Sequence, residues 1–324
     1  MKQVLIALIL MIMMGSCSSH HTDKNTGNAI SIDNQNENLL NENSVKELVA
    51  LNHEQYKNAK GDLKSFISLL GVLNKSKLSS IAIAMDYVKT CIVAGNQEND
   101  DIYVFFCGIY YNIANQISDS LEIKYTGVMD DFENNRNSSL LRIFKSNLAE
   151  CGTEIFSSEG QFYLDVEADY FYDNFKGIVS KGLKEYLAIR SEEMKKGFSE
   201  DAGLLISFEE VYKRAKRWEL FINDYPHAIC NEEARMYYET YLETLMTGMD
   251  NSRVFEGEEN IIVPEIKALY EEIMKEDAQS NITKIIISYY SFLSKNNFKE
   301  PENIDKFLKE NNLSSMLAVQ PFLR

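Results

Sequence analysis

The first proline of this 324-residue chain is Pro226, so the long stretch from Ser44 to Tyr225 contains none. Proline lacks the backbone N–H and clashes with the preceding turn, which makes it the strongest interrupter of a helix. Its absence over this span therefore favours helix. Apolar residues also recur at spacings of three and four, as on one face of a helix. We expect an all-α fold, built as a helical bundle or as an array of helical hairpins.

The same periodicity, with Ser44 as a helix cap, divides the first half of the chain into helices. They are expected at 44–59, 62–73, 79–94, 100–117 and 138–149, with two more at 168–180 and 184–196. Apolar residues surround the helix at 100–117 almost completely, which indicates a buried central helix; a strand over 102–107 is the alternative. Pro264 and Pro301 stand at the favoured first turn of two later helices.

Residues 153–166 interrupt the helical pattern. Two short apolar runs flank Ser-Ser-Glu-Gly there, which predicts a small β-hairpin or an extended insert. We place a domain boundary at this point. It separates an N-terminal helical region, 44–152, from a hairpin insert and C-terminal helical-repeat region, 153–324.

The last third of the chain contains an internal repeat with a shift of 52 residues. Residues 218–242, WELFINDYPHAICNEEARMYYETYL, match residues 270–294, YEEIMKEDAQSNITKIIISYYSFLS, without a gap. Glu219 corresponds to Glu271, and Tyr237-Tyr238 corresponds to Tyr289-Tyr290. Each copy predicts a helix, a short turn and a second helix. Chance similarity between two amphipathic helical pairs is the alternative interpretation.

These hairpins resemble the tetratricopeptide-like helical hairpins of bacterial envelope lipoproteins. In that group an aromatic-rich helix, a Tyr-Pro turn and a following helix with Ala and Tyr recur, as they do around Tyr225-Pro226. The sequence departs from the 34-residue period of that family, and its second copy lacks the proline. The resemblance implies hairpins that bury one face by stacking on their neighbours.

The N-terminus carries a targeting signal. Lys2 precedes an unbroken apolar run from Val4 to Met14, and Gly15 and Ser16 are small, which is the order of a secretory signal. Met14-Gly15-Ser16-Cys17 resembles a bacterial lipobox, although that pattern prefers Leu where Met14 stands. The resemblance implies a signal peptide over 1–16 and acylation of Cys17, palmitate included. The alternative is a plain secretory peptide in which Cys17 is incidental.

Residues 17–43 follow as the lipidated cysteine and a tether, which we expect to be disordered because the segment is rich in Asn and has no aromatic residue. The chain has a formal net charge of −16, and loss of Lys2 makes the mature protein more acidic still. Such a surface repels nucleic acid and anionic headgroups, so we expect no nucleic-acid partner and attachment to the membrane through lipid. The location expected is the cell envelope, either facing the periplasm or exposed at the surface.

Catalytic and metal-binding patterns fail on inspection. His53-Glu54 begins the zinc-protease pattern, but Lys57 stands where the second histidine is required. There is no G-x-S-x-G, no S-x-x-K and no phosphate-binding glycine loop. We therefore predict no catalytic residue, no metal and no cofactor. Four cysteines besides Cys17 are widely spaced, so disulfides and buried thiols both remain open: Cys91, Cys107, Cys151 and Cys230.

Two sets of residues are candidates for binding. Aromatic residues gather between 162 and 175, and a glycan could stack on those that are exposed, although aromatic residues more often form the core. The candidates there are Phe162, Tyr163, Tyr170 and Tyr172. The second helix of the first hairpin offers Arg235, Tyr238 and Tyr241 to a peptide.

The function expected is that of a lipid-anchored envelope protein that acts as a non-catalytic module or scaffold and binds a protein or peptide. A glycan-binding surface lipoprotein is the alternative. An acid–base hydrolase is a third possibility, because 49 acidic residues leave room for a catalytic pair that no motif identifies.

Overall fold

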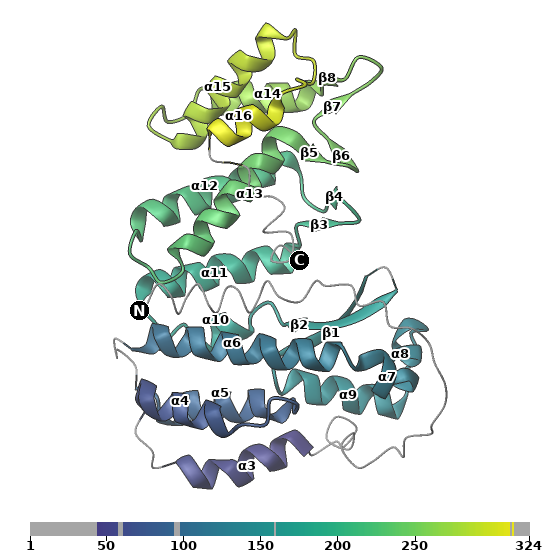
Figure 1. The fold of residues 1–324 in the computed structure, drawn as a ribbon, viewed down its shortest axis with the longest axis vertical. Helices are drawn as coiled ribbons and strands as arrows, with labels where there is room; N and C mark the ends of the chain where they lie inside the picture. Colours follow the sequence, from purple (N-terminus) through teal and green to yellow (C-terminus); the bar gives the residue numbers. More distant parts are fainter. Residues whose placement is uncertain (1–43, 58–60, 94–97, 159, 312, 314–324) are drawn as a thin grey trace. The chain divides into compact units, whose positions relative to one another are not determined.

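The computed structural model describes residues 44–57, 61–93, 98–158, 160–311 and 313. The predicted signal peptide, Cys17 and the tether up to residue 43 lie outside the described residues. The described part is predominantly helical and includes four small two-stranded antiparallel sheets (Figure 1). The expected fold class is confirmed at this level. The chain divides into two compact units between Ser180 and Lys181.

The first unit contains eight helices and one β-hairpin among its described residues. They are α3 (Ser44–Tyr56), α4 (Leu63–Val72), α5 (Ser79–Cys91), α6 (Asn99–Ser118), α7 (Leu121–Lys124), α8 (Thr126–Glu133), α9 (Ser139–Ala149), β1 (Thr153–Ser158), β2 (Gln161–Val166) and α10 (Tyr170–Phe175). Side chains set two of the helix starts: Asp62 accepts a hydrogen bond from the Ser65 backbone at 2.8 Å, and Ser138 accepts one from Leu141 at 3.0 Å.

Helix α6 is the centre of the first unit. It lies between the helices α4 and α5 and the β1–β2 hairpin (Figure 1). Every residue from Asn99 to Ala114 is buried or half-buried, because apolar and aromatic side chains cover all sides of this helix. The predicted buried central helix is confirmed, and the alternative of a strand over 102–107 is wrong.

The predicted insert is a β-hairpin. Strands β1 and β2 pair antiparallel, with Thr153 opposite Val166 and Ser158 opposite Gln161. The hydroxyl of Tyr110 on α6 donates a hydrogen bond to the Gly152 carbonyl at 2.8 Å and lies 2.8 Å from the Thr153 hydroxyl. These buried contacts fix the start of the hairpin on the central helix.

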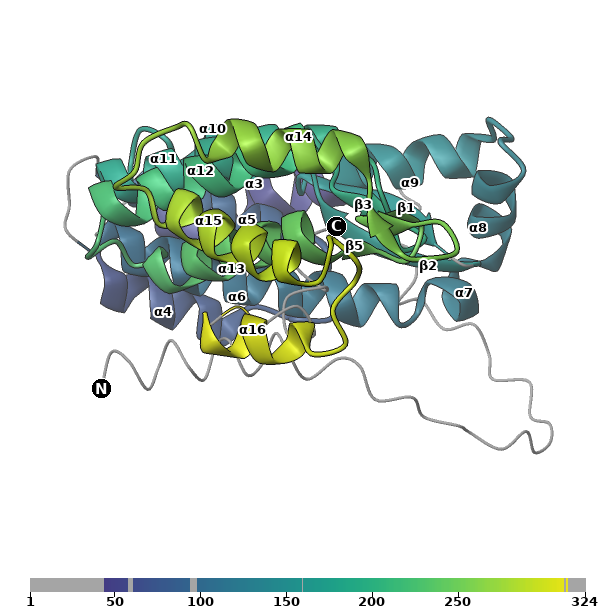
Figure 2. The ribbon, with the colours of Figure 1, turned by 90° about the horizontal axis from the view of Figure 1, so that it is seen from above.

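The second unit holds six helices and three minimal strand pairs among its described residues. They are α11 (Lys181–Lys196), β3 (Ser199–Glu200), β4 (Gly203–Leu204), α12 (Phe208–Asp224), α13 (Asn231–Thr247), β5 (Gly248–Met249), β6 (Ser252–Arg253), β7 (Phe255–Glu256), β8 (Ile261–Ile262), α14 (Pro264–Ile273), α15 (Asn281–Lys295) and α16 (Ile304–Glu310). Pro264 occupies the first turn of α14, as predicted. Helices α14 and α15 lie side by side in both views (Figures 1 and 2).

The two repeat windows each contain two helices joined by a turn. The rings of Trp218 and Tyr237 stack across the α12–α13 pair with centroids 5.1 Å apart. The residues that correspond to them, Tyr270 and Tyr289, meet across the α14–α15 pair at 6.0 Å. All four side chains are buried. Positions that match in sequence thus make an aromatic contact in both pairs, stacked in the first and edge-to-face in the second.

Several features differ from the prediction. Residues 121–133 form the short helices α7 and α8, which the sequence pattern did not predict, and the predicted helix 168–180 is reduced to α10. The compact units divide at residue 180, later than the predicted boundary at 153, because Tyr110 and the aromatic residues of α10 hold the hairpin to the first unit. Cys91, Cys107, Cys151 and Cys230 are buried and form no disulfide among the described residues, which agrees with the alternative of buried thiols.

Candidate functional site

A buried carboxylate lies at the meeting point of α11, α12 and α13 in the second unit. Glu193 on α11 is 5% exposed. Its oxygens accept hydrogen bonds from the Trp218 indole at 2.9 Å and from the Tyr241 hydroxyl at 2.9 Å. The Arg190 guanidinium, one helical turn away, donates a third at 3.2 Å. Three donors on three helices therefore satisfy this one side chain.

Burial governs the electrostatics of this group. It raises the pKa of Glu193, while the charges of Arg190 and Arg214 and the two hydrogen bonds from Tyr241 and Trp218 act in the opposite direction. The guanidinium of Arg190 also lies 4.1 Å from the centre of the Tyr237 ring. Charge, hydrogen bonds and aromatic stacking thus hold the three helices to one another.

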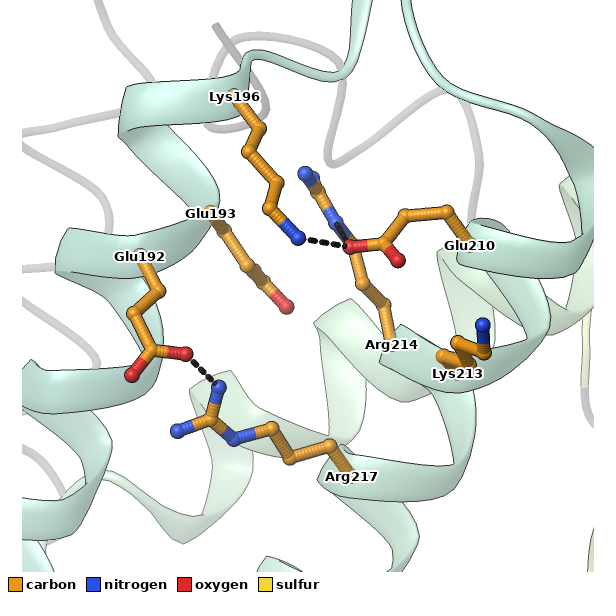
Figure 3. A pocket seen from close by; sticks show the side chains of 7 residues that line it. All are labelled: Glu192, Glu193, Lys196, Glu210, Lys213, Arg214 and Arg217. Carbon is orange, nitrogen blue, oxygen red and sulfur yellow. Dashed lines mark hydrogen bonds and ion pairs between the residues drawn. The ribbon is translucent and has the colours of Figure 1, made fainter.

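A pocket opens beside this carboxylate, between α11 and α12 (Figure 3). It has a volume of about 110 Å³, and every side chain that lines it is charged. The lining residues are Glu192, Glu193, Lys196, Glu210, Lys213, Arg214 and Arg217. In a chain with a net charge of −16, a hollow with four cations and three carboxylates is locally positive.

Ion pairs engage most of these charges. Lys196 donates to Glu210 at 2.7 Å, and Arg217 donates to Glu192. These hydrogen bonds lower the pKa of both carboxyl groups. Lys213 pairs with Glu209, outside the pocket, at 2.6 Å.

Arg214 forms only a long ion pair, with Glu210, and two of its nitrogens make no hydrogen bond among the described residues. Its side chain is 4% exposed, and its Nη1 lies 3.4 Å from the Tyr241 hydroxyl. Among the described residues, no hydrogen-bond partner reaches its Nε or its Nη2, both of which are buried. The nearest carboxylate oxygen belongs to Glu210 and lies 3.8 Å from Nε, beyond hydrogen-bonding distance. Figure 3 shows the guanidinium beside the Lys196 amine and the Glu210 carboxylate.

A second and larger cavity, of about 510 Å³, lies elsewhere in the second unit. Its lining combines loop residues of the short strand pairs with a few polar groups: Ala202, Thr247, Gly248, Met249, Asp250, Arg253, Val254, Phe255, Asn260 and Glu300. None of these residues has a buried side-chain polar atom without a partner. The charged pocket is therefore the stronger candidate site.

The four aromatic candidates do not form one platform. Phe162 and Tyr163 are neighbours on β2 and so point to opposite faces of the hairpin. Phe162 meets the Phe132 ring at 6.0 Å, and Tyr163 stacks on Phe156 at 5.7 Å. Tyr170 is buried, whereas Tyr172 is half-buried beneath the Lys176 amine.

The three candidates on α13 also separate. Arg235 is exposed and Tyr238 is half-buried. Tyr241 is fully buried and donates to Glu193, so it stabilises the interior of the unit. Cys17, the predicted acylation site, lies outside the described residues.

Sequence reasoning missed Glu193 and Arg214. A signal for Arg214 does exist: Val211, Ala215 and Trp218 lie on the buried face of α12, and Arg214 occupies that same face. A cation on an apolar helix face indicates a buried partner or a binding site. The hydroxyl that Arg214 meets belongs to Tyr241, which in turn donates to Glu193. Both residues lie on other helices, so neither leaves a pattern in the sequence around Arg214.

Within the described ranges, no helix is both long enough and apolar enough to cross a membrane. The same residues contain no group of three or more His, Cys, Asp or Glu side chains able to hold a metal ion. Comparison of the chain with models of protein families, with curated proteins and with solved structures gave no match.

Proposed function

We propose that this chain is a lipid-anchored protein of the cell envelope whose helical body is a non-catalytic binding module for a protein or peptide. The observation that carries the proposal is the pair of aromatic contacts at matching positions, Trp218–Tyr237 and Tyr270–Tyr289, in successive helical hairpins. Aromatic contacts at positions related by a fixed sequence shift support a tetratricopeptide-like repeat array. Such arrays present extended surfaces on which partners bind.

The connection between the two hairpins supports the same interpretation. Glu219 on α12 accepts hydrogen bonds from the Ser280 hydroxyl at 2.7 Å and from the backbone N–H groups of Asn281 and Ile282 at the start of α15. Tyr270 and Tyr289 donate to carbonyls at the end of α13, at 2.7 Å and 3.0 Å. The two hairpins are thus joined at the start of α15 and at the end of α13, as expected for neighbours in a stacked array.

The lipid anchor is proposed from Met14-Gly15-Ser16-Cys17. We expect Cys17→Ala to release the protein from the membrane fraction, because a single modified cysteine would carry all acyl chains and more than one chain is needed for stable anchoring. Phase partitioning in detergent and metabolic labelling with palmitate measure this. Unchanged partitioning of the variant would refute acylation at Cys17.

Site-specific photocrosslinking in intact cells tests the binding function. A photoreactive residue replaces Lys213, which is 61% exposed at the charged pocket, or the exposed Arg235 on α13. The control position is Ile123 in the first unit, which is 82% exposed. We expect a discrete protein adduct from at least one of the first two positions and none from Ile123. Absence of any adduct at Lys213 and Arg235 would refute the proposal.

An acid–base hydrolase is the second candidate, and one observation favours it. Burial raises the pKa of Glu193, whereas hydrogen bonds lower those of Glu192 and Glu210 in the same pocket, and divergent carboxyl pKa values are typical of acid–base pairs. The binding function is better supported because all three carboxylates are engaged by Arg, Lys, Trp or Tyr donors of the protein itself. Turnover of a glycoside or ester substrate that is lost in Glu193→Gln would reverse this order.

A further inference from the structure

We propose that the pocket between α11 and α12 binds the carboxylate group of a peptide, with Arg214 donating two parallel hydrogen bonds from Nε–H and Nη2–H. This inference rests on the proposed function, because a peptide partner supplies the carboxylate. It assigns a ligand class to the pocket and a role to Arg214, which no sequence motif identifies.

One edge of the Arg214 guanidinium is shaped to bind a carboxylate. The Nε and Nη2 donors lie on one edge of the planar group and point in parallel, which matches the two oxygens of a carboxylate. These are the two buried nitrogens of Arg214 that lack a partner, while Nη1 is directed to the Tyr241 hydroxyl at 3.4 Å. The edge suited to a carboxylate is therefore the open edge.

The unpaired donors of Arg214 are buried, which favours a ligand at this edge. Polar groups withdrawn from water are nearly always hydrogen-bonded, because an unpaired buried donor costs free energy. Arg214 is 4% exposed and lines a hollow of about 110 Å³. A ligand group in this hollow would satisfy both donors at once.

Glu210 does not fill this role in the structure. Its Oε1 is 3.8 Å from Nε of Arg214 but only 2.7 Å from the Lys196 amine. Lys196 thus keeps the Glu210 carboxylate near the open edge of Arg214 but beyond hydrogen-bonding distance of it. An incoming carboxylate competes with Glu210 for Arg214, so removal of the Glu210 charge should strengthen binding.

Charge selects the kind of oxyanion. Around the pocket Glu192 pairs with Arg217, Glu193 with Arg190, Glu210 with Lys196, and Lys213 with Glu209. Arg214 shares Glu210 with Lys196 and forms with it only a long ion pair of 3.8 Å, so these two cations and one carboxylate keep one positive charge. One negative charge balances it, which suits a monoanionic carboxylate better than a dianionic phosphate. The small volume admits the end group of a larger molecule, such as a peptide terminus or an acidic side chain.

The test follows the Nε–H resonance of Arg214 by nuclear magnetic resonance in the full-length protein in detergent micelles. The probes, at constant ionic strength, are acetate, inorganic phosphate, acetyl-Ala-Ala with a free carboxylate, and acetyl-Asp-amide. We expect a saturable shift with acetate and a weaker response to phosphate. Tighter binding of acetyl-Ala-Ala identifies a peptide C-terminus as the source, and tighter binding of acetyl-Asp-amide identifies an acidic side chain.

Three variants make the test specific. Their affinity for the tighter-binding of the two peptide probes is measured by calorimetric titration instead of by the Arg214 resonance. Arg214→Lys keeps the charge but loses the parallel donors, so the affinity should fall about tenfold. Glu210→Gln removes the competing charge on a side chain that is 26% exposed and should raise the affinity. Lys216→Gln is the matched control on the same helix, outside the pocket, and should leave the affinity nearly unchanged.

Absence of a saturable shift, phosphate binding more tightly than acetate, or an affinity unchanged in Arg214→Lys and not raised in Glu210→Gln would each overturn the assignment. If Arg214→Lys fails to fold, the sign of the Glu210→Gln effect still decides. Carboxylate binding without any photocrosslinked partner would refute the proposed function and leave the pocket assigned. A crosslinked partner without carboxylate binding would refute the pocket assignment and leave the proposed function in place.

Discussion

At the scale of single residues, the second unit depends on charges that its helices remove from water. Burial raises the pKa of Glu193 above its usual value of 4.5, and Arg190 and Arg214 act against this. When the pKa of a carboxyl group is higher in the folded than in the unfolded state, its contribution to stability is fully present at pH values below the pKa of the unfolded state. That contribution is lost as the pH rises through the folded pKa. Glu192 has the opposite sign, because its hydrogen bond to Arg217 lowers its pKa.

We therefore predict opposite pH dependences for two neighbouring substitutions. From about pH 4 to about pH 8, the free energy of unfolding of the wild type relative to Glu193→Gln should fall. Relative to Glu192→Gln it should rise at the acidic end of the range and then level off, with a smaller amplitude because Glu192 is 60% exposed. Urea unfolding at a series of pH values measures both. If the difference in unfolding free energy changes with pH in the same direction for both variants, the opposite pKa shifts of Glu193 and Glu192 are contradicted.

A single glycine determines how the first unit passes from α9 into its hairpin. Gly152 has a φ of +62°, and a Cβ at this position would lie 1.8 Å from the Tyr170 ring. We predict that Gly152→Ala lowers the free energy of unfolding by about 3 kcal/mol, from backbone strain and overpacking together.

The matched control is Gly160→Ala. Gly160 also has a positive φ, +77°, but a Cβ there would meet nothing within 4 Å. This variant should lose only about 1 kcal/mol, the cost of the backbone conformation. Chemical denaturation followed by circular dichroism compares the two. Equal losses would show that contact with Tyr170 contributes nothing.

At the scale of elements, sequence periodicity was sufficient wherever a helix has a clear apolar face or is apolar all round. The apolar residues of α6 predicted a buried central helix, and Tyr225-Pro226 predicted the turn between α12 and α13. The two-residue strand pairs and the short helices α7 and α8 escaped prediction because they are too short to show a period. Arg214 and Glu193 escaped because their partners approach from other helices, up to 48 residues away in the case of Tyr241.

The junction between the two helical hairpins provides a test within the repeat itself. Glu219 caps the start of α15, whereas Glu271, its counterpart 52 residues later, is exposed and accepts a hydrogen bond from Tyr290 at 2.6 Å. We predict that Glu219→Gln weakens the start of α15 by about 1 kcal/mol, because charged acceptors form stronger hydrogen bonds than neutral ones. Hydrogen exchange at the Asn281 and Ile282 amides should accelerate several-fold.

Glu271→Gln is the control for this junction. It changes the same residue type at the equivalent position but removes no helix cap, so exchange at the α15 amides should stay unchanged. Equal acceleration in the two variants would mean that general charge effects, and not the cap, explain the result.

At the scale of the whole molecule, the chain folds as two units with separate cores. Phe106, Tyr110 and Phe175 lie in the core of the first unit, and Trp218 and Tyr241 lie in that of the second. Periodicity alone placed the boundary at the hairpin because the sequence pattern changes there. The contact of Tyr110 with Gly152 and Thr153 instead binds the hairpin to the first unit, and such long-range contacts leave no local pattern.

The single tryptophan of the chain, Trp218, is a natural probe of this division because it is buried in the second unit. We predict that in urea its fluorescence reports unfolding of the second unit alone, while far-ultraviolet circular dichroism reports both units, so that the two transitions do not coincide. Glu193→Gln should shift the fluorescence transition to lower urea by removing the charge partner of the half-buried Arg190. Gly152→Ala should shift only the part of the dichroism transition that fluorescence does not detect. Coincident transitions that move together in both variants would show instead that the two cores unfold as one cooperative structure.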